Sequence, residues 1–99
     1  MKTKAFEVQN LRQIKVTFLP ATNTRGSRIK IYEPKRYNDD KAQKKVFSYS
    51  YETGDVMEQA YAVLINNGWN VMCRASETDN YLFLCNNWGE DFKEIKDLK

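Results

Sequence analysis

Residues 55–68 are Asp-Val-Met-Glu-Gln-Ala-Tyr-Ala-Val-Leu-Ile-Asn-Asn-Gly, and this stretch decides the fold. Its apolar residues recur at helical spacing and share one face. They are Met57, Ala60, Tyr61, Leu64 and Ile65. Asp55 suits the N-cap, with Glu58 three residues later, and Gly68 suits the position that follows a last helical turn. The stretch predicts a helix over residues 55–67 whose apolar face would lie across a sheet.

On both sides of this helix, apolar and polar residues alternate as they do in half-buried strands. The predicted strands are residues 12–19, 28–32 and 45–51 before the helix, and residues 69–75 and 81–86 after it. Residues 35–44 are charged without an apolar period, which predicts an exposed connection. Residues 89–98 suit either a short helix or a last extended segment.

Because short links join neighbouring strands, we predict an α+β fold. It has an antiparallel sheet of about five strands, in the order β-β-β-α-β-β, packed on one main helix. At 99 residues the chain has the size of one domain, so we predict a single domain over residues 1–99.

The last two strands contain both cysteines of the chain. A hairpin centred on Asp79 would set Cys73 opposite Cys85. Two cysteines are too few for a disulfide scaffold, and we expect reduced thiols that act as small apolar residues on neighbouring strands. A regulatory disulfide between them is the open alternative.

The chain contains no histidine, which excludes Ser-His-Asp and Cys-His catalysis and any metal bound through histidine. Two thiols without a CxxC pair leave no zinc site. The acidic pairs Asp39-Asp40 and Glu90-Asp91 are adjacent in sequence, so neither pair has to converge on one site. We therefore expect a protein that is not an enzyme and that uses no cofactor or metal.

No apolar run approaches the roughly 20 residues that a membrane span needs. The basic start, Met1-Lys2-Thr3-Lys4, is not followed by the apolar segment of a signal peptide. We expect a cytoplasmic protein without a membrane segment, in an oligomeric state that the sequence leaves open.

The charged residues are divided unevenly along the chain. Residues 1–45 contain twelve Lys or Arg and four acids, whereas residues 46–99 contain four Lys or Arg and nine acids. Such polarity indicates an anionic partner for the basic part. Mutual neutralisation of the two parts in the folded protein is the other interpretation.

A polar, basic loop, Pro-Ala-Thr-Asn-Thr-Arg-Gly-Ser-Arg over residues 20–28, lies between the first two predicted strands. Arg25 and Arg28 carry planar, forked donors that suit phosphate, and the small polar residues around them favour turns. Together with the Lys and Arg residues that follow it, the loop predicts a hairpin that binds nucleic acid. Its candidate residues are Thr22, Asn23, Thr24, Arg25, Ser27, Arg28, Lys30, Lys35 and Arg36. Tyr32 and Tyr37 lie among them, and aromatic rings on an open sheet face can stack bases.

Two other interpretations stay open. In one, Trp88 and the acidic second half form a protein-binding surface, for a basic partner or for a second copy of the chain. Trp69 and Trp88 equally suit lids over the edge of the core. In the other, the loop is structural, and Asn23 and Arg25 tie the hairpin to the core.

The run from Pro20 to Lys30 resembles a Pro-x-Thr-Asn-x-Arg-Gly-Ser-Arg motif of small uncharacterised proteins from phages, plasmids and Bacteroides-type conjugative elements. In that motif the loop follows the first strand and a single helix comes later, and Ala21 stands where Thr is common. The resemblance implies a setting but no mechanism. It implies a noncatalytic accessory protein of a mobile genetic element that binds nucleic acid, or a counter-defence protein that binds a host protein.

Overall fold

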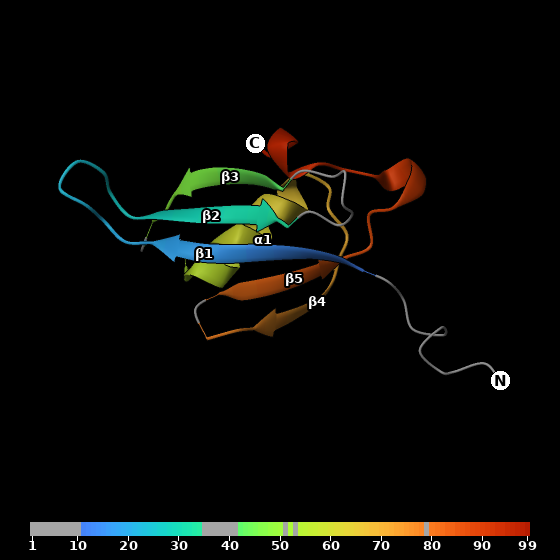
Figure 1. Ribbon diagram of the computed structural model, residues 1–99, viewed down its shortest axis with the longest axis horizontal. Helices are drawn as coiled ribbons and strands as arrows, with labels where there is room; N and C mark the ends of the chain where they lie inside the picture. Colours follow the sequence, from blue (N-terminus) through green and yellow to red (C-terminus); the bar gives the residue numbers. More distant parts are fainter. Residues whose placement is uncertain (1–10, 35–41, 51, 53, 79) are drawn as a thin grey trace.

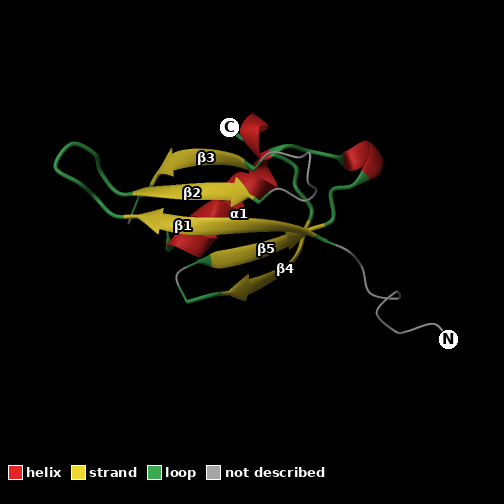
Figure 2. Cartoon of the chain, viewed as in Figure 1, coloured by secondary structure: helices red, strands yellow, loops and turns green. Residues whose placement is uncertain are grey.

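The computed structural model describes residues 11–34, 42–50, 52, 54–78 and 80–99. In this part of the chain, one antiparallel sheet has the strand order β3-β2-β1-β5-β4, and the helix α1 lies across one of its faces (Figures 1 and 2). The elements are β1 (Arg12–Leu19), β2 (Arg28–Glu33), β3 (Gln43–Ser48), α1 (Val56–Asn66), β4 (Val71–Ser76), β5 (Tyr81–Cys85) and the 3-10 helices η2 (Gly89–Asp91) and η3 (Ile95–Asp97). The predicted α+β class and the order of strands and helix are confirmed. None of the helices in the described ranges has the length and apolar character of a membrane span.

Helix α1 begins and ends where its capping residues predict. The Asp55 side chain accepts a hydrogen bond from the Glu58 N–H at 2.8 Å, so the first turn has a side-chain cap. Gly68 follows the helix with a φ of 81°, a left-handed conformation that glycine adopts without steric cost. The Trp69 N–H then donates to the Leu64 carbonyl and closes the C-terminal end.

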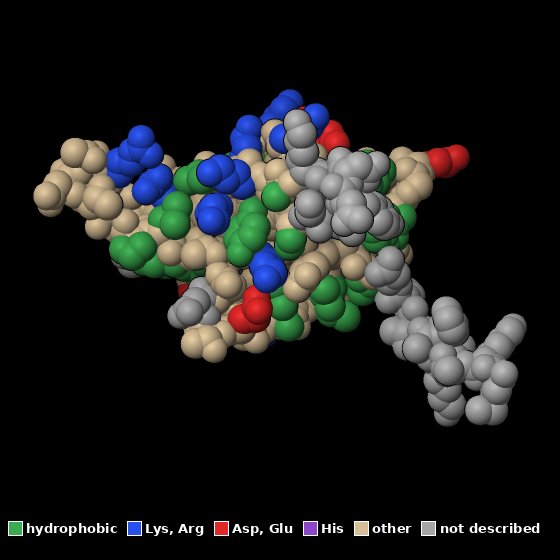
Figure 3. Space-filling view, in the orientation of Figure 1, with side chains coloured by type: hydrophobic (Ala, Val, Ile, Leu, Met, Phe, Trp, Pro, Cys, Tyr) green, Lys and Arg blue, Asp and Glu red, His purple; other side chains and the backbone are tan. Residues whose placement is uncertain are grey.

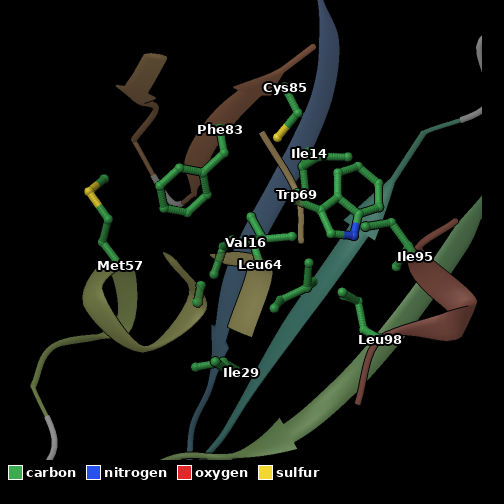
Figure 4. Close-up of a cluster of buried hydrophobic side chains, with 12 residues drawn as sticks. Ile14, Val16, Ile29, Met57, Leu64, Trp69, Phe83, Cys85, Ile95 and Leu98 are labelled. Atoms are coloured by element: carbon green, nitrogen blue, oxygen red, sulfur yellow. The ribbon is translucent and has the colours of Figure 1, made fainter. Parts of the chain in front are cut away.

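The core lies between α1 and the inward face of the sheet (Figure 4). Alternate residues of β1, β2 and β5 supply the sheet side of this core, as the alternation predicts. They are Ile14, Val16, Ile29, Ile31, Phe83 and Cys85. Helix α1 contributes Met57, Ala60 and Leu64, and Trp69, Ile95 and Leu98 complete the cluster. The C-terminal segment therefore belongs to the core, and it forms two short 3-10 helices where the sequence left a helix or an extended segment open.

Strand β3 differs from its predicted bounds of 45–51. It begins at Gln43, inside the segment that we predicted as an exposed connection, and Lys44 pairs with Tyr32 of β2. A strand at the edge of a sheet leaves many side chains in solvent, so this segment needs no apolar period to join the sheet. Tyr51, in the predicted strand, lies outside the described residues.

The expected pairing of Cys73 with Cys85 is wrong. Cys73 pairs with Leu84, because the pairing that runs from Ser76–Tyr81 to Cys73–Leu84 is shifted by one residue from the predicted register. A bulge between Val71 and Cys73 then sets Cys85 opposite Val71. A shift of one residue places a side chain on the opposite face of a sheet. Cys85 consequently lies in the core and Cys73 lies in solvent.

Candidate nucleic-acid interface

The face of the sheet that points away from α1 carries basic side chains on three neighbouring strands. Tyr32 of β2 lies opposite Lys15 of β1 and Lys44 of β3. Arg28 and Lys30 precede Tyr32 on the same face of β2, because alternate residues of a strand share a face. We call Lys15, Arg28, Lys30, Tyr32 and Lys44 the basic face. All five side chains are partly or fully exposed.

The acids of the same strands do not offset this charge. The one acid in β1, β2 and β3 is Glu33, which is buried on the opposite face. From outside these strands, Glu77 reaches Lys15 in a surface ion pair, with 3.6 Å between Nζ and Oε1. Such an exposed pair contributes little to stability, so Lys15 stays available to another anion. Figure 3 looks onto this face and shows Lys and Arg side chains gathered over β2 and β3.

Two details of β2 shape the donors of the basic face. The Nε of Arg28 is buried and has no hydrogen-bond partner in the described chain. The Nζ of Lys30 lies 4.7 Å from the centre of the Tyr32 ring, an attractive cation–π distance. One side of this ring is therefore occupied by an ammonium group, and Tyr32 holds a charge in place on this face. The stacking of nucleic-acid bases on Tyr32 that the sequence suggested cannot occur on the side of the ring that Lys30 occupies.

The loop between β1 and β2 projects beyond the end of the sheet (Figure 1). The Thr22 N–H donates to the Arg25 carbonyl at 2.8 Å, and the Arg25 N–H donates to Thr22 Oγ1 at 3.2 Å. Thr22, Asn23, Thr24 and Arg25 are exposed. The Ser27 carbonyl accepts a hydrogen bond from the Tyr49 N–H at 3.0 Å and thereby anchors the base of the loop beside β3.

The side chains of Asn23 and Arg25 make no hydrogen bond or ion pair with any residue that the structure describes. The interpretation in which they tie the hairpin to the core therefore has no support from the contacts of the loop. The hydrogen bonds within the turn join Thr22 and Arg25.

The structure brings together only part of the predicted site. Arg28 and Lys30 share the basic face, and the predicted loop residues lie at one end of it. Lys35 and Arg36, together with Tyr37, lie outside the described residues. The prediction missed Lys15 and Lys44. The alternation of β1 already points Lys15 outward, whereas Lys44 falls in the segment without an apolar period.

Of the Lys and Arg residues that the structure describes in the first half of the chain, Arg12 alone is completely buried. Its guanidinium donates to both carboxylate oxygens of Glu33, at 2.9 and 2.8 Å, and to the Asn87 carbonyl at 3.0 Å. The ring centres of Phe92 and Trp69 lie 4.3 and 4.7 Å from its central carbon. This cluster is built to hold the fold, because each of the three guanidinium nitrogens already donates to a buried partner. The signal was present in the sequence, because Arg12 has the spacing of the inward residues of β1.

Trp88, the anchor of the alternative interpretation, is half-buried beside the same cluster. The Arg12 guanidinium lies 5.8 Å from its ring centre. Trp69 is buried, with 4% of its surface exposed. Trp69 therefore belongs to the core cluster, and Trp88 lies beside the buried Arg12.

Burial raises the pKa of the Cys85 thiol from 9.0 to about 12, although the nearby charge of Arg12 acts in the opposite direction. Cys85 is therefore a protonated core residue at neutral pH. No cluster of three or more potential metal ligands occurs within the described ranges.

Comparison with protein-family models, with curated proteins and with solved structures gave no match.

Proposed function

We propose that this protein binds nucleic acid through the basic face, chiefly by contacts with phosphate groups. The register of β1, β2 and β3 carries the proposal, because it places four cations on the face of the sheet that points away from α1. The acid of these strands, Glu33, is turned into the core and paired with Arg12. A predominantly positive surface attracts a polyanion and gains affinity from the release of its counterions.

The members of the basic face would have different tasks. Arg28 supplies a planar fork of donors that matches a phosphate group, and its unsatisfied Nε is one donor that a rotated side chain would offer to an anion. Lys15, Lys30 and Lys44 act as point charges. Arg25 extends the cationic surface along the projecting loop. These contacts read the backbone of a nucleic acid and carry no preference for a base sequence.

In the setting that the Pro20–Lys30 resemblance implies, such a protein would be a noncatalytic accessory protein of a mobile genetic element. We do not place a protein partner on Trp88, because its ring packs beside Arg12.

The test is fluorescence anisotropy of labelled single- and double-stranded DNA and RNA over a salt series. Four phosphate contacts predict a slope of log K against log salt between about −2.8 for single strands and about −3.6 for a duplex. Absence of binding at about 50 mM salt, where such contacts are strong, would exclude the proposal.

A pair of double variants separates the basic face from charge in general. Arg28→Ala/Lys30→Ala should make the slope shallower by about 1.4 to 1.8, since two contacts are lost. Lys93→Ala/Lys99→Ala removes the same charge near the C-terminal end of α1, on the other side of the sheet, and should leave most of the slope intact. Equal losses from both double variants would show that the protein has no localised site.

A further inference from the structure

A groove lies between α1 and β4, on the helix side of the sheet, with a volume of about 350 Å³. Its lining is mainly apolar and includes Met57, Tyr61, Val71, Met72 and Phe83. Met72 and Tyr61 are 46% and 47% exposed, unusually high values for large apolar side chains that lie together. Contiguous exposed apolar surface is typical of sites that another molecule covers.

The groove lies beside an open edge of the sheet. In the described chain, β4 pairs with β5 on one side and with no strand on its other side. At the opposite edge, β3 carries Lys44 next to Lys45, and adjacent lysines discourage pairing with another strand. Strand β4 contains a single charged residue, Arg74, so its edge is the less protected of the two.

The charges at the groove indicate what covers it. Arg74 and Glu58 both line the groove, yet they do not form an ion pair with each other or with any described residue. Among the described residues, the Arg74 Nη1 donates only to the Met57 sulfur, at 3.1 Å, and this sulfur is a weak acceptor. A groove with one positive and one negative charge is complementary to itself. A partner of a single sign would leave one of these charges without an opposite.

We propose that this edge is the interface between two copies of the chain. Strand β4 pairs in antiparallel fashion with β4 of a second copy, which continues the antiparallel order of the sheet. A two-fold axis perpendicular to the sheet generates this pairing, with each contact made twice. Arg74 of each copy faces Glu58 of the other, and Met72 and Tyr61 are buried where the two grooves meet. Both basic faces then lie on the same side of one continuous sheet.

Sedimentation velocity of the whole chain tests the proposal directly. We expect a dimer that dissociates on dilution. A monomer at every concentration up to about 1 mM, the weak end of protein association, would overturn the proposal, whatever peptide or other protein the groove then bound.

The native Cys73 provides a second measurement, because it is exposed on β4 while Cys85 is buried. A short bis-maleimide should link two chains of 11.7 kDa through Cys73 at concentrations where the dimer forms. Cys73→Ser should abolish the link and keep the sedimenting dimer. A dimer in which Cys73 cannot be linked would place the interface elsewhere and refute the β4 pairing.

Charge reversal identifies the contact itself. Arg74→Glu and Glu58→Arg should each raise the dimer Kd at least about tenfold, because like charges then face each other. The double variant Glu58→Arg/Arg74→Glu should return the Kd to near the wild-type value.

The control is Glu90→Arg on η2, which makes the same charge change as Glu58→Arg but away from the groove. It should have little effect on the Kd. Circular dichroism confirms that each variant is folded. An unchanged Kd in both single variants would contradict the Arg74–Glu58 contact. So would a Kd that stays raised in the double variant.

Discussion

Arg12 and Glu33 form a two-point ion pair inside the core, with 2.9 Å between Nε and Oε2 and 2.8 Å between Nη2 and Oε1. Their side chains are 0% and 4% exposed. The third donor of Arg12 binds the carbonyl of Asn87, which is 75 positions away in sequence. This pair therefore joins the first hairpin to the C-terminal segment, and it withdraws one base and one acid from the surface.

Loss of the Glu33 charge should destabilise the protein strongly. Glu33→Gln leaves the buried Arg12 without a counter-charge, which costs about 3–5 kcal/mol of unfolding free energy in comparable sites. Glu77→Gln is the matched control, because it breaks the exposed pair with Lys15 and should cost less than about 1 kcal/mol. Urea denaturation measures both variants. Similar losses for the two would mean that the buried pair has no special role.

The two thiols should react at very different rates. Cys73 is exposed, whereas Cys85 is buried with a pKa raised to about 12. A thiol reagent at pH 8 should therefore modify one cysteine of the native protein, and both after denaturation. Mass mapping that finds Cys85 modified at the rate of Cys73 in the native state would contradict the burial of Cys85.

Cys85 should also make stability depend on pH in the alkaline range. The folded state holds the Cys85 proton more tightly than the unfolded chain, whose thiol titrates near the ordinary value of 9.0. The resulting stabilisation is present in full below pH 9 and is lost as the pH rises towards about 12. The stability advantage of the wild type over Cys85→Ala should therefore shrink across this range. An advantage that stays constant from pH 8 to 11 would contradict the shift in the Cys85 pKa.

The projecting loop should be dispensable for folding. The side chain of Arg25 is exposed and makes no hydrogen bond or ion pair with a described residue, so Arg25→Ala should change the free energy of unfolding by less than about 0.5 kcal/mol. In the proposed function the same variant should weaken nucleic-acid binding moderately. A large fall in the melting temperature would instead support a structural role for the loop.

Two adjacent lysines of β3 offer a matched test of the basic face. Lys44 belongs to that face, whereas Lys45 points to the helix side and donates to the Lys96 carbonyl at 3.3 Å. Lys44→Glu and Lys45→Glu change the net charge equally. Only Lys44→Glu should weaken nucleic-acid binding steeply, as measured by anisotropy at low salt. A stronger effect at Lys45 would move the site to the other side of the sheet.

Much of the fold could be predicted from local pattern. The spacing from Met57 to Ile65, with Asp55 and Gly68 at the ends, identified the helix to within a residue of its observed bounds. Alternation identified the inward residues of β1 and β2. The edge strand β3 was less predictable, because an edge strand does not need the apolar alternation that reveals a half-buried one.

The candidate site was predictable only in part. Arg28 and Lys30 could be assigned to one face because they are two positions apart on a single strand. Lys15 and Lys44 join them through cross-strand pairing, which no spacing within one strand reveals. The register of Cys73 was mispredicted for a related reason, since it follows from the hairpin turn that pairs Ser76 with Tyr81, and alternation within a strand does not fix the centre of that turn.

The sequence by itself determined the helix, the existence and inward face of each well-patterned strand, and the exclusion of histidine chemistry. These properties follow from the repeat of a single helix or strand and from the residue types present. Only the tertiary structure decided that Arg12 is buried with Glu33, that four cations share the face of the sheet that points away from α1, and that an apolar groove opens beside β4. Those properties depend on which distant segments pair and in what register, and pairing is set by packing and turn geometry across the whole chain.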